Sequence, residues 1–331
     1  MKKYFIVAFM YALPALSYCV PDNETCFDCG ANCIAELTYS KGENNQNIGT
    51  MTIYGTNNGV GTMDSWSYSG KDPNRTTTAP WKDKLSDINN VVVSEGVTNV
   101  GGYTFSGAKN LSHVELPQSV NTIDIYAFLD STLETVNTLK NVTSFGAAAF
   151  YNSNLRDADL SENLTEIPRD LFVGTNISSI KIPDNLTSIG AYAFAVCRNV
   201  TQIEIPDSVT NIGYMAFAYM NNLTDLTIPD TLELQIFDGD ITAFSGLDLN
   251  SITLHCAGVL EQCKANMLAI GYQEGTYTMV QAPYSKKQAD GSVAYYGADG
   301  KFKGYKGKRI YTLDEANKAT GAVNRVSIKY R

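Results

Sequence analysis

The chain has 331 residues, of which 18% are charged and 44% are hydrophobic. This composition is typical of a folded, soluble protein with a large core and more than one module, and it excludes a chain that is disordered throughout. The formal net charge is −9, from 25 Lys or Arg and 34 Asp or Glu. This acidic balance argues against a nucleic-acid-binding protein.

The charge is unevenly distributed along the chain. Residues 285–331 hold eleven Lys or Arg and four Asp or Glu, a balance of +7, so residues 1–284 carry −16. We expect this basic C-terminal module to contact an anionic surface, either an anionic envelope polymer or the acidic body of the protein itself. The candidate contact residues are Lys301, Lys303, Lys306, Lys308 and Arg309.

Residues 1–17 have the order of a secretory signal peptide. Lys2 and Lys3 precede an apolar run from Tyr4 to Leu16, and Ala15-Leu16-Ser17 offers a cleavage site, with cleavage as late as residue 19 left open. An apolar run of about 13 residues is too short to cross a bilayer. We therefore expect an exported protein, at the cell surface, secreted or periplasmic, with no membrane span.

An exported chain with seven cysteines favours disulfides. Only two histidines are present and no fourth ligand lies near Cys26-x-x-Cys29, so we predict neither a metal site nor a cofactor. The pairing within Cys26, Cys29 and Cys33 stays open, whereas Cys256 and Cys263 are a candidate disulfide.

Residues 18–83 are predicted to form an N-terminal β cap. Residues 34–39 and 49–54 are expected to form a hairpin around the polar turn 41–47. Residues 59–78 are rich in Gly, Ser, Asn and Thr and indicate a loop.

Residues 84–254 consist of a repeated unit. The segment from Ile177 to Phe194 matches the segment from Val200 to Phe217 position by position. Units begin at Ile88, Leu111, Leu133, Leu155, Ile177, Val200, Leu223 and Leu249, with spacings of 22 or 23 residues and a last spacing of 26. This period, with apolar residues at positions 1, 4 and 6 of each unit, is the signature of a leucine-rich repeat.

The positions of the unit predict its geometry. Positions 4 and 6 point inward from a short strand, and positions 10 and 13 form a second inward row. Glycine at position 14, as in Gly190 and Gly213, is expected to permit a turn with positive φ. Position 18 is Phe in the first six units, and Phe244 takes this place in the seventh unit after a short insertion. Because one unit cannot bury these faces, the units must stack into a solenoid with a spine of Phe rings.

The pattern I-x-I-P-x-S-V-T-x-I-G-x-x-A-F, seen from Ile203 to Phe217, resembles the BspA-type leucine-rich repeats of bacterial surface proteins. The stretch from Gly49 to Gly55, followed by Ala79-Pro80-Trp81, is similar to the leader of such repeats. The resemblance implies a secreted or surface-displayed protein that binds proteins, often as an adhesin. It implies no catalytic residue.

Outward positions 3 and 5 of successive units form the expected binding surface, which we call the concave face. It is polar and mildly acidic, and it lacks the Trp, Tyr and Arg that dominate tight interfaces. Two interpretations of the concave face remain open: it binds a partner, or it is simply solvated. The candidate partner-binding residues are His113, Glu115, Asp157, Asp159, Lys181, Glu204 and Asp225.

Two further segments follow the repeats. In the C-terminal cap, residues 255–284, apolar spacing predicts a helix over about 258–270. A disulfide between Cys256 and Cys263 requires Cys256 to lie on the preceding strand. In residues 285–331 we predict a hairpin of 293–296 and 301–305, a helix capped by Thr312 and a final strand over 325–331.

The predicted fold is thus a mostly β solenoid of the α/β type, with a β cap, a helical cap and a small β/α module. None of the nucleophile-elbow, zinc-protease or phosphate-loop motifs occurs, so we do not expect an enzyme. Two functions remain: an adhesin-like protein that binds a host or neighbouring-cell protein, and an envelope structural protein held on its own cell by the basic module.

Overall fold

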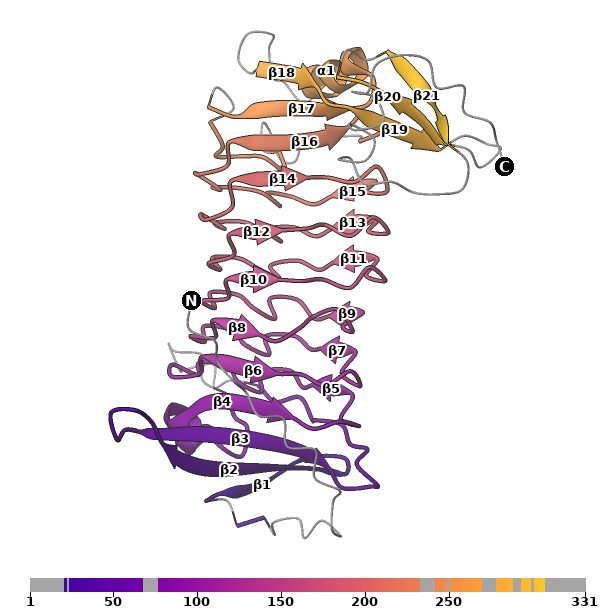
Figure 1. The fold of residues 1–331 in the computed structure, drawn as a ribbon. Helices are drawn as coiled ribbons and strands as arrows, with labels where there is room; N and C mark the ends of the chain where they lie inside the picture. Colours follow the sequence, from indigo (N-terminus) through magenta and orange to yellow (C-terminus); the bar gives the residue numbers. More distant parts are fainter. Residues whose placement is uncertain are drawn as a thin grey trace.

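The computed structural model describes residues 21–22, 24–67, 77–232, 242–248, 251–269, 278–287, 293–298 and 301–306. These residues form a column of stacked coils with β strands at both ends (Figure 1). The solenoid predicted from the repeat period is therefore confirmed. The predicted signal peptide, the helix after Thr312 and the strand over 325–331 lie outside the described residues.

Three antiparallel strands begin the column. β1 (Cys26–Gly30) pairs with β2 (Cys33–Lys41), which pairs with β3 (Asn47–Gly55). The β2–β3 pair is the predicted hairpin, longer at both ends, whereas β1 was not predicted. β3 then runs parallel to β4 (Ile88–Val93), the first strand of the repeats, so the hairpin continues the repeat sheet.

Each coil contributes one strand to a first side of the column. These strands are parallel, and Figure 1 shows them one above another. They are β4, β6 (His113–Glu115), β8 (Thr135–Val136), β10 (Asp157–Ala158), β12 (Ser179–Ile180), β14 (Gln202–Glu204), β16 (Asp225–Pro229), β17 (Thr253–Ala257) and β18 (Thr278–Gln281).

A second, shorter strand lies at positions 12 and 13 of most coils. The two sheets on this side are β5–β7–β9 and β11–β13–β15. Their strands are β5 (Asn99–Val100), β7 (Thr122–Ile123), β9 (Ser144–Phe145), β11 (Glu166–Ile167), β13 (Ser188–Ile189) and β15 (Asn211–Ile212). Position 13 is buried in all of them, as the second inward row predicted.

The Phe rings at position 18 form a continuous stack in the centre of the column. Neighbouring ring centroids are 5.4 Å apart for Phe128 and Phe150 and 5.5 Å apart for Phe194 and Phe217, with nearly parallel planes. Each ring is at most 1% exposed. A buried Phe contributes about 2–3 kcal/mol of transfer free energy, so this spine is a main source of stability.

Trp81 closes the spine at its N-terminal end. Its ring stacks on Phe105 at 5.9 Å and meets Phe27 and Trp66 edge-on. The indole Nε1 donates to the Thr104 carbonyl oxygen at 3.1 Å, so the buried N–H has a partner. The N-terminal strands therefore share one hydrophobic core with the repeats.

The prediction of positive φ for glycine at position 14 is wrong. Positive φ occurs at positions 16 and 20, for example 58° at Tyr192 and 64° at Val196. The glycines serve a different purpose: a Cβ on Gly146 would lie 2.1 Å from the Ile125 nitrogen, and one on Gly213 would lie 2.4 Å from the Ala191 nitrogen. Glycine lets the backbones of adjacent coils approach closely at this position.

The helix predicted after the repeats is α1 (Leu260–Ala269). Asp230 accepts a hydrogen bond from the Val259 nitrogen at 2.8 Å, and the Asn266 amide donates to the Leu232 carbonyl oxygen at 2.8 Å. A disulfide joins Cys256, on β17, to Cys263, on α1, with Cα atoms 6.0 Å apart. These contacts hold the helix against the last strands of the column.

A separate three-stranded sheet follows. It contains β19 (Tyr284–Lys287), β20 (Val293–Tyr296) and β21 (Phe302–Lys306), all antiparallel. The β20–β21 pair is the predicted hairpin. β19 was not predicted.

Candidate functional site

The parallel register places the concave-face residues side by side. Asn90 is opposite His113 and His113 is opposite Thr135, while Asp157 is opposite Ser179. Position 3 of one coil thus neighbours position 3 of the next, as expected from the repeat. All seven candidate residues are half-buried or exposed, so they can be reached from solvent.

The last coil differs from the prediction. Counting from Leu249 gives Ser251 and Thr253 as its outward residues, but β17 pairs with β16 so that Thr253 is opposite Asp225 and His255 is opposite Thr227. The outward residues are therefore Thr253 and His255. The insertion at 233–240, outside the described residues, interrupts the period and shifts the count.

The shift brings a second histidine onto the concave face. His255 Nε2 lies 3.0 Å from Asp225 Oδ1. The hydrogen bond from His255, and a second one from Thr224, lower the pKa of Asp225. At the other end, His113 Nδ1 lies 2.7 Å from Thr135 Oγ1, and His113 Nε2 lies 3.6 Å from Glu115 Oε1.

Two more candidates are engaged in ion pairs. Lys140 Nζ lies 2.9 Å from Asp159, and Lys181 Nζ lies 2.5 Å from Glu162. The hydrogen bond that Lys181 Nζ donates to Glu162 Oε1 raises the pKa of Lys181. These groups are largely exposed, so each pair contributes little to stability.

Asp157 and Glu204 remain as open acidic groups. Both are exposed, and within the described part of the chain the structure records no ion pair or hydrogen bond to either carboxylate. They lie on β10 and β14, two strands apart in the stack and offset by two residues along the strands, which corresponds to roughly 12 Å between their Cα atoms. An unpaired carboxylate is free to accept a hydrogen bond from a cationic partner.

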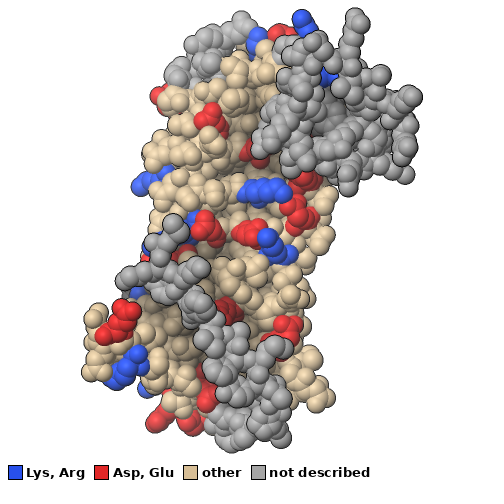
Figure 2. Space-filling model, viewed as in Figure 1, with Lys and Arg blue, Asp and Glu red and all other residues tan. Residues whose placement is uncertain are grey.

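Figure 2 shows that acidic and basic side chains are scattered over the visible face of the coils, without a large patch of one sign. Among the described residues, no group of three His, Cys, Asp or Glu is arranged to bind a metal ion. In the same residues no helix is both long and apolar enough to span a bilayer.

The basic candidates of the C-terminal module are partly described. Lys301 precedes β21, and Lys303 and Lys306 lie on it, with Lys301 and Lys303 exposed. Lys308 and Arg309 lie outside the described residues.

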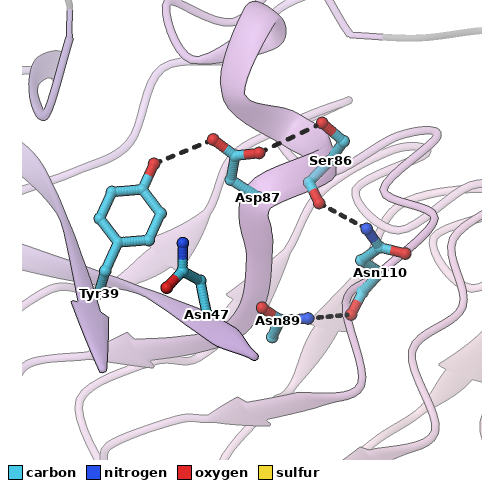
Figure 3. Close-up of a pocket in the computed structure, with 6 residues that line it drawn as sticks. All are labelled: Tyr39, Asn47, Ser86, Asp87, Asn89 and Asn110. Carbon is cyan, nitrogen blue, oxygen red and sulfur yellow. Dashed lines mark hydrogen bonds between the residues drawn. The ribbon is translucent and has the colours of Figure 1, made fainter. Parts of the chain in front are cut away.

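A pocket of about 340 Å³ lies where the hairpin meets the first coils, and sequence reasoning did not identify it. Tyr39 and Asn47 come from the ends of β2 and β3 beside the hairpin turn. The other lining residues come from the edge of the coils: Ser86, Asp87, Asn89 and Asn110 (Figure 3). Tyr39 Oη donates to Asp87 Oδ2 at 2.9 Å across the opening.

The family model for the BspA-type leucine-rich repeat region matches residues 83–200 and 187–263, in six copies. The chain belongs to this family. Repeats of the BspA type typically serve as non-enzymatic scaffolds for protein–protein interaction at a surface, and the resemblance stated from the sequence is confirmed.

Several solved structures are similar to this BspA-type chain. A leucine-rich repeat protein from Eubacterium ventriosum is 19% identical, with 71% of this chain and 72% of that chain covered and a TM-score of 0.38. One from Bacteroides ovatus is 17% identical, with coverages of 68% and 70% and a TM-score of 0.38. A leucine-rich cell surface protein from Faecalibacterium prausnitzii is 23% identical, with coverages of 54% and 62% and a TM-score of 0.30. No curated protein matches the chain significantly.

Proposed function

We propose that this BspA-type protein is exported and binds a protein partner, from a host or from a neighbouring cell, through its concave face. In this proposal residues 18–83 and 255–284 close the two ends of the repeats in 84–254, and residues 285–331 form a separate basic module. Family membership supports a surface interaction role, and the signal-like residues 1–17 support export.

The observation that carries the proposal is the pair of open carboxylates, Asp157 and Glu204. The neighbouring charges are already paired within the chain: Asp159 with Lys140, Lys181 with Glu162, and Asp225 with His255. The rigid strands therefore present two acidic groups at a fixed spacing. A partner with Lys or Arg side chains at that spacing would gain charge-assisted hydrogen bonds without reordering the repeats.

Site-specific photo-crosslinking tests the proposal. A benzophenone amino acid replaces Glu204 on the concave face of the full chain, and a matched protein carries it at Arg169. The Arg169 side chain is 67% exposed and follows β11, on the second side of the column. The proposal predicts a defined protein adduct from position 204, with host matrix or with intact cells, and no such adduct from position 169.

The same adduct from both positions would contradict the proposal, because it would show contact that does not depend on the concave face. Adducts from position 169 alone would contradict it as well. Intact-mass measurement of both proteins and matching melting temperatures control for folding.

The basic module supports a second function, retention on the protein's own cell as a structural component of the envelope. The observation that favours it is the concentration of charge, +7 within residues 285–331 against −16 in the rest of the chain. An anionic envelope polymer would attract this module and leave the acidic repeats exposed.

A further inference from the structure

We propose that the pocket between the N-terminal hairpin and the edge of the first two coils binds a neutral sugar unit of a glycan. Its volume, about 340 Å³, is at the lower end of the range for small-molecule sites. None of its lining residues belongs to the concave face, so this site is separate from the proposed protein-binding surface and can operate alongside it.

Part of the lining forms a fixed frame. Asn89 Oδ1 accepts a hydrogen bond from the Gly49 nitrogen at 2.9 Å, and its Nδ2 donates to the Asn110 carbonyl oxygen at 3.4 Å. Asn110 Nδ2 donates to the Ser86 carbonyl oxygen at 2.5 Å. These amides connect the hairpin, the short 3-10 helix Lys82–Asp87 before β4 and the next coil, so the pocket is preformed.

The remaining lining groups face the open space. Asn47 Oδ1 accepts from Lys41 Nζ at 2.8 Å, which orients the amide and leaves its NH₂ group as a donor toward the pocket. Figure 3 shows this amide lying beside the Tyr39 ring, with Asp87 above them. Asp87 Oδ2 accepts from Tyr39 Oη at 2.9 Å, and the carboxylate keeps further lone pairs that can accept from a ligand, so donor and acceptor groups stand close together.

This combination matches the chemistry of a sugar. Each hydroxyl of a pyranose both donates and accepts, so adjacent hydroxyls can bond an amide NH₂ and a carboxylate oxygen at once. The Tyr39 side chain is 46% exposed and offers a ring face with partial negative charge, against which the C–H groups of a sugar can pack.

The charges of the pocket favour a neutral ligand. Among the described residues that line the pocket, Asp87 is the one with a formal charge, and Lys41 lies at the rim through its bond to Asn47. A phosphate or an acidic sugar would meet the Asp87 carboxylate, while a divalent cation needs more oxygen ligands of high charge than one carboxylate supplies. A polar ligand without net charge satisfies both constraints.

The test is saturation-transfer NMR on the full chain, with free glucose, galactose, mannose and N-acetylglucosamine as probes, followed by titration of the strongest binder. We expect a dissociation constant in the millimolar range, the order typical of a few hydrogen bonds and one ring contact. An array with separate bacterial envelope polysaccharides and host glycans then distinguishes the two sources of the sugar.

Substitutions of the lining residues test whether the sugar binds in this pocket. We expect the dissociation constant to rise about tenfold in each of three variants, Tyr39→Ala, Asn47→Ala and Asp87→Asn. A tenfold rise corresponds to the loss of one favourable contact with the sugar. Tyr39→Phe keeps the ring and should lose less. Tyr219→Ala is the matched control, because Tyr219 is 48% exposed but lies far along the column, and it should bind like the wild type.

Three outcomes would overturn the proposal: no saturation transfer to any of the four sugars, unchanged binding by the Tyr39→Ala and Asn47→Ala variants, or preference for phosphate over every neutral sugar. Melting temperatures within a few degrees of the wild type ensure that a loss reflects the pocket. If a variant unfolds, Tyr39→Phe and Asp87→Asn still decide the matter because they preserve side-chain volume.

Discussion

Phe194 shows how a single residue of the repeat determines stability. Its ring lies between Phe172 and Phe217, at centroid distances of 5.7 and 5.5 Å, and is fully buried. Phe194→Ala would leave a cavity inside the spine, so we expect a loss of about 3–5 kcal/mol in the free energy of unfolding. Chemical denaturation measures this loss; an unchanged midpoint would show that the ring does not support its neighbours.

Cys197 gives a second prediction at this scale. It is a free, buried cysteine whose Sγ lies 3.0 Å from the Phe172 carbonyl oxygen. Burial raises the pKa of its thiol to about 11, so at pH 8 the reactive thiolate is scarce as well as inaccessible. We expect iodoacetamide to leave Cys197 unmodified in the folded protein and to modify it after unfolding. Rapid alkylation of the folded protein would be inconsistent with this burial.

The disulfide between Cys256 and Cys263 joins two secondary-structure elements, β17 and α1. We expect the exported protein to contain this bond, and peptide mapping without reduction should recover the two cysteines in one linked species. Cys256→Ser with Cys263→Ser should cost about 2–3 kcal/mol, the loop entropy of a short closure. Recovery of both cysteines alkylated, without prior reduction, would refute the bond.

Elements that follow the period were predictable, because the repeated positions translate directly into buried rows. Other features depend on how the coils pack. The close backbone approach at Gly146 exists only once Ile125 of the preceding coil is beside it. The register of β17 could not be predicted from the repeat period, because an insertion precedes this strand and interrupts the period. Tyr39 and Asp87 are 48 residues apart and share no motif, so no local pattern could reveal the pocket.

At the scale of the molecule, the acidic body and the basic module have opposite charges. Retention on the cell through residues 285–331 would rest on Lys and Arg near an anionic surface, each contributing up to about 1 kcal/mol. Screening within a Debye length of about 8 Å at physiological salt weakens such contacts. We expect a wash at about 0.5 M salt, or replacement of Lys301, Lys303, Lys306, Lys308 and Arg309 by Gln, to release the protein. Retention that survives both treatments would rule out electrostatic binding by the module.

The proposed function depends on partner binding by the concave face, and reversing the charge of its two open carboxylates tests this dependence. The double variant Asp157→Lys with Glu204→Lys replaces the two open carboxylates by positive charges. The control, Glu166→Lys, makes the same kind of change in the coil of Asp157, but on β11, on the second side of the column. The measurement is the dissociation constant for the protein captured at position 204. We predict at least a tenfold increase for the double variant and a change of less than about twofold for Glu166→Lys, since each lost charged contact is worth about a factor of ten. Equal affinities for the wild type and the double variant would contradict the account.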